Sequence, residues 1–168
     1  MFNSKLIVPL IAILTVSPLA LAGGGNWQVV QGTAIHYESE GIEHSQTPTA
    51  TGYVRVSTDI VELAGDLVGR AVFQPVSEVN VVEGTIVNTG SQVFSGTVLN
   101  SDPVMLHDDG FRFHINMATG ETTGRIYLTD RIAGPVVRCI LKMEGTGRTA
   151  EGYNLSNYWG RCKLKHNR

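Results

Sequence analysis

The stretch FRFHINMATGETTGRIYLT, residues 111–129, decides the fold class. On both sides of its central segment 118–121, apolar and polar residues alternate, as they do in β-strands that bury one face. Gly120 suits a tight turn because glycine adopts a positive φ without a steric penalty. The stretch therefore predicts an antiparallel hairpin whose buried face carries Phe111, Phe113, Ile115, Met117, Ile126 and Leu128.

Similar runs of Val, Ile, Thr, Tyr and Phe, each closed by Gly, Asn, Asp or Pro, recur along the chain. They predict strands over 27–37, 51–57, 66–74, 76–87, 92–99, 111–117, 122–129, 136–144 and 153–164. Segment 46–50 is expected to be an exposed loop, and 59–63 a single helical turn. The fold class is all-β, a single antiparallel β-barrel of about eight or nine strands. A barrel is favoured over a sandwich because closure removes unpaired strand edges.

The first 22 residues have the pattern of a cleaved signal peptide. Lys5 precedes an apolar run, and Ala20-Leu21-Ala22 is a small-x-small cleavage site. The alternative is a membrane anchor, but the run is short for a span and contains Pro9 and Pro18. We expect residues 23–168 to be one secreted or periplasmic domain that is not membrane-bound after cleavage.

Composition limits the classes of partner. Thirteen Lys and Arg against 15 Asp and Glu give a formal net charge of −2, so the chain has no basic excess to neutralise a phosphate backbone. A nucleic-acid partner is therefore not expected. The 19 Gly among 168 residues are typical of a chain with many tight turns.

The two cysteines, Cys139 and Cys162, are predicted to form a disulfide. An exported protein meets an oxidising compartment, where such a pair usually closes. The midpoint of the pair lies near Ala150, inside the Gly-rich turn 145–152, so a terminal hairpin would bring both residues together. A zinc site and a C-x-x-C redox pair fit this spacing less well.

No catalytic motif is recognisable. The chain has no G-x-S-x-G, P-loop, dinucleotide fingerprint or helical zinc motif, and no catalytic residue, metal or cofactor is assigned. The cluster His107-Asp108-Asp109 with His114 is read as a polar turn, and the group His36, Glu38, Glu40, Glu43 and His44 as a solvated edge. If the first strand continued past His36, however, a carboxylate there could orient the imidazole.

The polar faces of the strands supply the candidate ligand-binding residues. These side chains either line a barrel lumen or face water while the phenylalanines fill the core. The candidates are Arg112, His114, Asn116, Arg125 and Tyr127, with Arg138 and Tyr158 also on polar positions.

The C-terminal pattern MEGTGRTAEGY, residues 143–153, followed by YWGRC, residues 158–162, resembles the closing hairpin of bacterial secreted proteins related to the allene oxide cyclase barrel. FSGTV, residues 94–98, and INMATGE, residues 115–121, are similar to turns in that group. The resemblance implies a calycin-like antiparallel barrel with a hydrophobic lumen, in a superfamily of which some members cyclise a bound intermediate. It transfers no catalytic residue to this chain.

The sequence is compatible with three functions. The first is a secreted barrel that binds a small, partly apolar ligand. The second is an isomerase or cyclase acting by pocket shape, with His114, Tyr127 or Arg112 assisting. The third is a protein-binding module, such as an inhibitor of an extracellular enzyme, that uses the loops 41–50 and 100–109.

Overall fold

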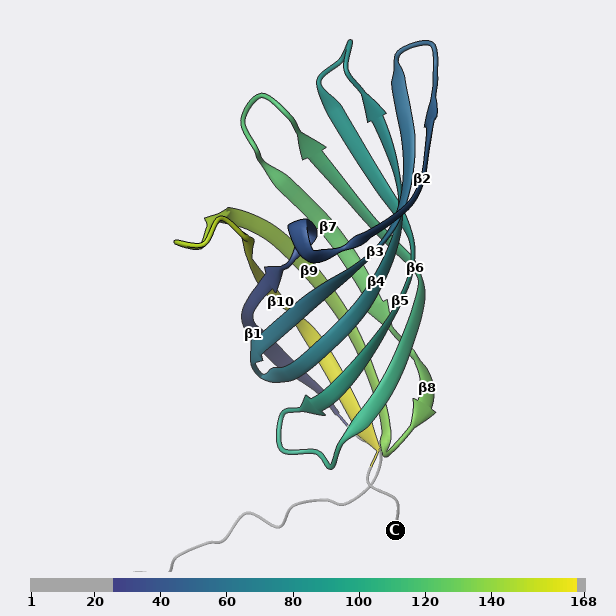
Figure 1. Cartoon of the computed structure of the whole chain (residues 1–168). Coiled ribbons are helices and arrows are strands. Elements are labelled where there is room, and N and C mark those ends of the chain that lie inside the picture. The colour runs from purple at the N-terminus through teal and green to yellow at the C-terminus, as the bar shows by residue number, and fades with distance from the viewer. Residues whose placement is uncertain (1–25, 166–168) are drawn as a thin grey trace, which may run out of the picture.

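The computed structural model describes residues 26–165, all of whose regular structure is β-strand except for one short 3-10 helix (Figure 1). The predicted signal peptide and cleavage site lie outside the described residues. The elements are β1 Trp27–His36, η1 Glu38–Glu40, β2 Ile42–Pro48, β3 Gly52–Gly65, β4 Leu67–Asn80, β5 Thr85–Val98, β6 Val104–Asn116, β7 Thr122–Leu128, β8 Asp130–Ala133, β9 Val136–Arg148 and β10 Asn154–Lys165. Within residues 26–165, no helix is long and apolar enough to span a membrane.

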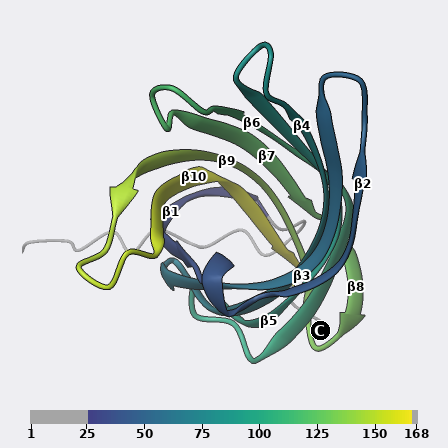
Figure 2. The same ribbon diagram turned by 45° about the horizontal axis from the view of Figure 1, so that its top comes forward.

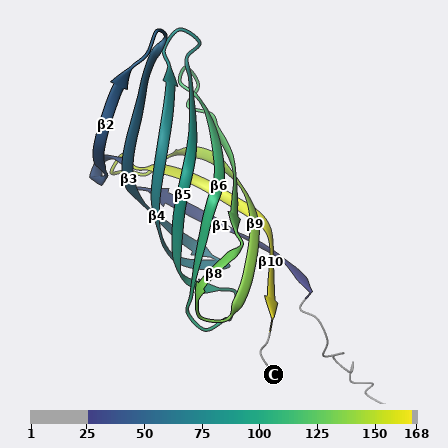
Figure 3. The ribbon, with the colours of Figure 1, turned by 90° about the vertical axis from the view of Figure 1, so that its right-hand side faces the viewer.

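Eight antiparallel strands form a closed barrel, which confirms the predicted fold class. The ring runs β1-β10-β9-β7-β6-β5-β4-β3, and β1 pairs with β3 to close it (Figure 2). The other two strands add to the ring: β2 pairs with β3, and β8 pairs with β6. In Figure 3 the long strands β3 to β6 run side by side from one end of the barrel to the other.

The barrel closes over only part of the length of β3. Residues 61–65 of β3 pair with β1, whereas residues 53–58 pair with β2. The 3-10 helix η1 connects β1 to β2 at the point where β3 exchanges one partner for the other. Residues 53–58 of β3 therefore have no pairing across the barrel to the start of β10 at Asn154. We call this gap in the strand pairing the seam.

One end of the barrel is filled with apolar side chains. The inward positions alternate with exposed ones along the strands, most regularly on β4, because successive strand residues point to opposite faces. Many of the residues that are at most 2% exposed lie toward the end where β1 begins and β10 ends: Val30, Leu67, Phe94, Val98, Leu106, Leu128, Val137, Cys139, Tyr158 and Cys162.

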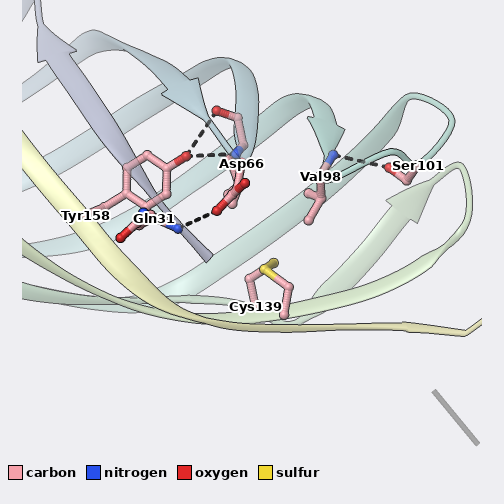
Figure 4. The surroundings of a disulfide bond; sticks show 8 residues. Gln31, Asp66, Val98, Ser101, Cys139 and Tyr158 are labelled. Carbon is pink, nitrogen blue, oxygen red and sulfur yellow. Dashed lines mark hydrogen bonds between the residues drawn. A yellow bond between two sulfur atoms is a disulfide. The ribbon is translucent and has the colours of Figure 1, made fainter. Parts of the chain in front are cut away.

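The predicted disulfide is present. Cys162 of β10 is paired directly with Cys139 of β9, and the two sulfur atoms are bonded. Figure 4 shows the surroundings of the disulfide, where the hydroxyl of the buried Tyr158 accepts a hydrogen bond from Leu67 N at 2.7 Å. Nearby, Asp66 Oδ2 accepts a hydrogen bond from Gln31 N at 2.8 Å, so β1 and β10 are both tied to the β3–β4 turn.

Several predicted boundaries were wrong. Segment 59–63 is not a helical turn but part of β3, and 46–50 is mostly the paired strand β2 rather than a loop. The proposed binding loops 41–50 and 100–109 consist largely of β2 and the start of β6. In each case, pairing with a neighbouring strand outweighs the local sequence preference.

Pro75 does not separate two strands, as the sequence had suggested, but lies within β4. Proline has no N–H to donate to a ladder. The β3–β4 ladder is interrupted at this point, since its register passes from Val56↔Val76 to Asp59↔Phe73 without a pair between them. The interruption lets β4 continue through the proline.

Candidate functional site

An internal cavity of about 810 Å³ occupies the end of the barrel opposite the start of β1 and the end of β10. It extends to the turns between β6 and β7 and between β9 and β10, with Gly120, Glu121 and Arg148 among its outermost lining residues. In Figure 2 this end of the barrel comes toward the viewer. The volume is within the range of about 300–1,000 Å³ that is typical of small-molecule sites.

The floor and one wall of the cavity are apolar. Leu63, Phe94, Leu128 and Leu141 line the floor, where the cavity meets the filled end of the barrel. On the wall, Phe73 and Phe113 lie 6.0 Å apart between ring centroids, and Phe111, which does not line the cavity, packs against Phe73 at 4.4 Å. Rigid aromatic surfaces of this kind bind apolar groups at a low cost in conformational entropy.

A row of polar residues lies beside these phenylalanines on the cavity wall, since Asn88 at the end of the row is paired with Phe113. Arg55 of β3 is paired with Ser77 of β4, and Ser77 with Asn88 of β5, and all three line the cavity. Asn88 Oδ1 is buried and has no hydrogen-bond partner within the described residues. We call Arg55, Ser77 and Asn88 the polar row.

The charge of Arg55 is compensated from outside the row. Glu38 Oε1 lies 3.3 Å from Arg55 Nη1, and Glu43 Oε2 lies 3.2 Å from Arg55 Nε. The Nε contact is an ion pair that is not aligned as a hydrogen bond, so Nε is also without a hydrogen-bond partner in the described part of the chain. The guanidinium therefore meets two carboxylates before any ligand arrives.

A histidine on the cavity wall is held by a buried carboxylate. His36 Nε2 lies 3.2 Å from Asp59 Oδ2, which also accepts a hydrogen bond from the Ser57 hydroxyl at 3.2 Å. Because a carboxylate can only accept, the contact favours the tautomer that carries its proton on Nε2 and leaves Nδ1 as a base. The edge of the His36 ring also packs against Phe73, at 5.6 Å between centroids.

Local structure places Asp59 inside the barrel. Ser57 and Asp59 occupy inward positions of β3, where its ladder with β4 is interrupted, and both are at most 2% exposed. Gly41 covers Asp59 closely, since a side chain on residue 41 would collide with Asp59 Oδ1. The same Oδ1 has no hydrogen-bond partner among residues 26–165.

The seam is bridged by side chains from η1, from the first residue of β10 and from the residue before it. The Tyr153 hydroxyl donates to Glu40 Oε1, and Asn154 Nδ2 donates to Glu38 Oε2 at 3.0 Å. The hydrogen bond to Glu40 raises the pKa of Tyr153 above its usual value. The hydroxyl therefore stays protonated and keeps donating through the neutral pH range.

The structure separates the five predicted ligand-binding residues. Arg112, His114 and Arg125 are exposed on the outer face of the barrel, where Arg112 Nε donates to His114 Nε2 at 3.1 Å. Tyr127 occupies an outward position between two buried, inward residues of β7. Of the two orientations that the sequence allowed, these four residues have the one that faces away from the lumen.

Asn116 alone among the five lines the large cavity. Its Oδ1 also accepts hydrogen bonds from Ala118 N and Thr119 N, at 2.9 and 3.1 Å, and so shapes the β6–β7 turn. A smaller hollow of about 210 Å³ lies beside it, with His114 and Glu121 in its lining.

The cluster around His107 has a structural role, because the Asp108 carboxylate accepts hydrogen bonds from β5, from β7 and from its own strand β6. Asp108 Oδ2 accepts from Gln92 Nε2 at 3.1 Å and from Tyr127 N at 2.8 Å, while Oδ1 accepts from Gly110 N at 2.8 Å. No group of three or more metal-binding side chains is found within residues 26–165.

Sequence reasoning missed the polar row and the partner of His36. It had weighed whether a carboxylate could orient His36, but on β1 itself, whereas Asp59 comes from β3. The alternating residues Tyr53, Arg55, Ser57 and Asp59 could have indicated this site, because they place four side chains with hydrogen-bonding groups on one face of a strand.

Comparison of the chain with protein-family models, curated proteins and solved structures finds no match. The resemblance of its C-terminal hairpin to the allene oxide cyclase group stays a prediction. Fold and cavity together define the class of the molecule as a closed antiparallel β-barrel with an amphipathic internal cavity.

Proposed function

We propose that this protein is an exported barrel that binds a small, partly apolar ligand inside the cavity. The observation that carries the proposal is the cavity of about 810 Å³, with an apolar floor and a few convergent polar groups. This combination is typical of small-molecule sites, where apolar contact supplies affinity and the polar groups set orientation.

The division of the barrel into a filled end and a hollow end supports the proposal. Side chains can fill the interior of an eight-stranded barrel completely, so an internal cavity is not required by the fold. Here the filled end contains the disulfide and the most deeply buried residues, whereas the hollow end contains the polar row. Stability can therefore reside at one end and binding at the other.

Export is the second part of the proposal. It rests on the signal-peptide pattern of residues 1–22 and is supported by the Cys139–Cys162 disulfide. Disulfides form and persist mainly in oxidising compartments. A periplasmic or secreted location suits both features.

Matched substitutions on β6 test the binding site. Ile115 lines the cavity, and the neighbouring His114 is exposed on the outer face. With the neutral dye N-phenyl-1-naphthylamine as the probe, we expect saturable fluorescence enhancement for the wild type and for His114→Trp. Ile115→Trp should bind the dye at least tenfold more weakly, because the indole occupies the cavity.

The same pair of variants also distinguishes the cavity from the outer face. Weaker binding by His114→Trp with unchanged binding by Ile115→Trp would move the site to the outer residues Arg112, His114 and Arg125. Absence of dye binding by the wild type would count against an internal ligand site. Circular dichroism of each variant checks that the barrel has folded.

The His36–Asp59 pair favours an isomerase or cyclase as a second candidate function. A base at Nδ1 can remove a proton from one atom of a bound molecule and return it to another, so that the composition is unchanged. Mass spectrometry of molecules extracted from the wild type and from His36→Gln tests this. Isomers that differ between the two proteins would support catalysis, whereas the same isomer in both would leave binding alone.

A further inference from the structure

The polar row gives information about the head group of the ligand. Arg55, Ser77 and Asn88 are paired in register on three neighbouring strands, and beyond Asn88 the row ends at Phe113 of β6. Since neighbouring strands lie about 4.8 Å apart, the row extends over about 10 Å of the cavity wall. A ligand whose tail rests on the apolar floor would place its polar end against this row.

Asn88 requires a hydrogen-bond donor. Its Oδ1 is buried without a partner within the described residues, although Asn88 lines the cavity. An unpaired buried amide oxygen is costly, and such groups are normally paired. The terminal amide can turn about its last torsion, so a donor in the cavity can reach the oxygen. A carboxylate, which only accepts hydrogen bonds, could pair with the amide Nδ2 but would leave Oδ1 without a donor, whereas a hydroxyl can pair with either atom.

Arg55 does not favour an anion. It forms ion pairs with Glu38 and Glu43, so the three side chains together carry a formal charge of −1. A ligand carboxylate would add a second uncompensated negative charge to a partly enclosed site, and burying an unpaired charge is unfavourable. A ligand ammonium group would lie in the same row as the Arg55 guanidinium, and the two positive charges would repel each other.

We infer that the cavity selects a neutral, hydroxyl-bearing apolar molecule. A hydroxyl donates one hydrogen bond and accepts others, so it can donate to Asn88 Oδ1 and accept from the guanidinium or from Ser77. The hydrocarbon part then lies along Phe113 and Phe94 toward the floor. This inference rests on the proposed function, because it specifies the ligand of the same cavity.

Three probes with one tail and different heads test the inference. Decanol, decanoate and decylammonium are titrated at neutral pH against the wild type carrying bound N-phenyl-1-naphthylamine, and displacement of the dye is measured. We expect decanol to bind at least tenfold more tightly than either charged probe. Equal or tighter binding of decanoate or decylammonium would overturn the inference while the proposed function stands. If neither the dye nor any probe binds, the proposed function itself fails.

Two sets of variants assign the selectivity to residues. Asn88→Leu should weaken decanol binding about tenfold, the effect of losing one hydrogen bond of ordinary strength. Thr89→Leu, on the outer face of the same strand, is the matched control and should leave decanol binding unchanged. Unchanged decanol affinity in Asn88→Leu would overturn the role of Asn88.

The double variant Glu38→Gln/Glu43→Gln tests the charge argument in the opposite direction. It leaves the Arg55 guanidinium without its two carboxylates while preserving the size of both side chains. Decanoate affinity should then rise at least tenfold and decanol affinity should change little. If decanoate binding does not increase, compensation of Arg55 is not the basis of selectivity.

Discussion

At the residue scale, the Tyr158 hydroxyl joins β10 to the β3–β4 turn through the barrel interior. It accepts from Leu67 N at 2.7 Å and lies 3.2 Å from both Ala64 O and Leu67 O. In Tyr158→Phe the buried Leu67 N–H loses its partner, so we expect the free energy of unfolding to fall by about 1–3 kcal/mol. Urea denaturation at neutral pH measures the loss. An unchanged midpoint would mean that water or a backbone carbonyl replaces the hydroxyl.

The same hydroxyl predicts a loss of stability at alkaline pH. Burial raises the pKa of Tyr158 above its usual value of 10.0. A raised folded-state pKa contributes stability that is fully present below pH 10.0 and is lost as the pH rises through the folded value. The stability advantage of the wild type over Tyr158→Phe should therefore shrink between neutral pH and about pH 11. A constant difference would contradict the shift.

Gly124 and Phe113 form a second coupled pair of residues. They are directly paired on β7 and β6, and a side chain on residue 124 would overlap the Phe113 ring. Gly124→Ala should displace the ring toward the cavity, lower the free energy of unfolding by about 1–3 kcal/mol and weaken dye binding. The control is Gly110→Ala, where an added Cβ has its nearest neighbour at 3.8 Å, so its effect should stay within about 0.5 kcal/mol.

At the element scale, the disulfide joins the two strands of the β9–β10 hairpin. Its cysteines are 23 residues apart and fully buried. Closing a loop of this length stabilises a fold by about 3 kcal/mol in the chain-entropy description. Cys139→Ala/Cys162→Ala should lower the free energy of unfolding by about that amount in urea. Reductant should destabilise the wild type similarly and leave the double variant unchanged, and an insensitive wild type would contradict the prediction.

The elements also show how far the sequence could predict the fold. The hairpin 111–129 and the pairing of Cys139 with Cys162 were predictable, because alternation and turn glycines are local signals. The length of β4 could not be predicted. A strand tolerates an internal proline only where the ladder with its neighbour is interrupted, and here the interruption depends on β3. A local sequence signal cannot report such pairing.

Prediction of the site had the same limit. Alternation identified inward residues such as Phe113 and Ile115, which do line the cavity, but it left open which face of β6 was internal. The polar row is formed by register across β3, β4 and β5, and Asp59 reaches His36 from another strand. Contacts made by long-range pairing follow from closure of the barrel and not from any one segment.

At the scale of the whole molecule, the filled end and the hollow end have different roles. The filled end contains the disulfide and Tyr158, so substitutions there should change stability more than ligand binding. The hollow end contains the polar row, whose unpaired groups cost stability when no ligand is present. A bound ligand that pairs these groups should raise the stability of the entire barrel by mass action.

Export, the disulfide and ligand retention can all be measured in the protein produced from its full chain. We expect cleavage after Ala22, which removes Lys5 and changes the formal net charge from −2 to −3. Denaturing mass spectrometry without reductant should give the mass of residues 23–168 less two hydrogens, and reduction should restore both. A native mass higher than the denatured mass would identify a retained small molecule. An uncleaved chain with free thiols would contradict the proposed location, because neither processing nor oxidation would then have occurred.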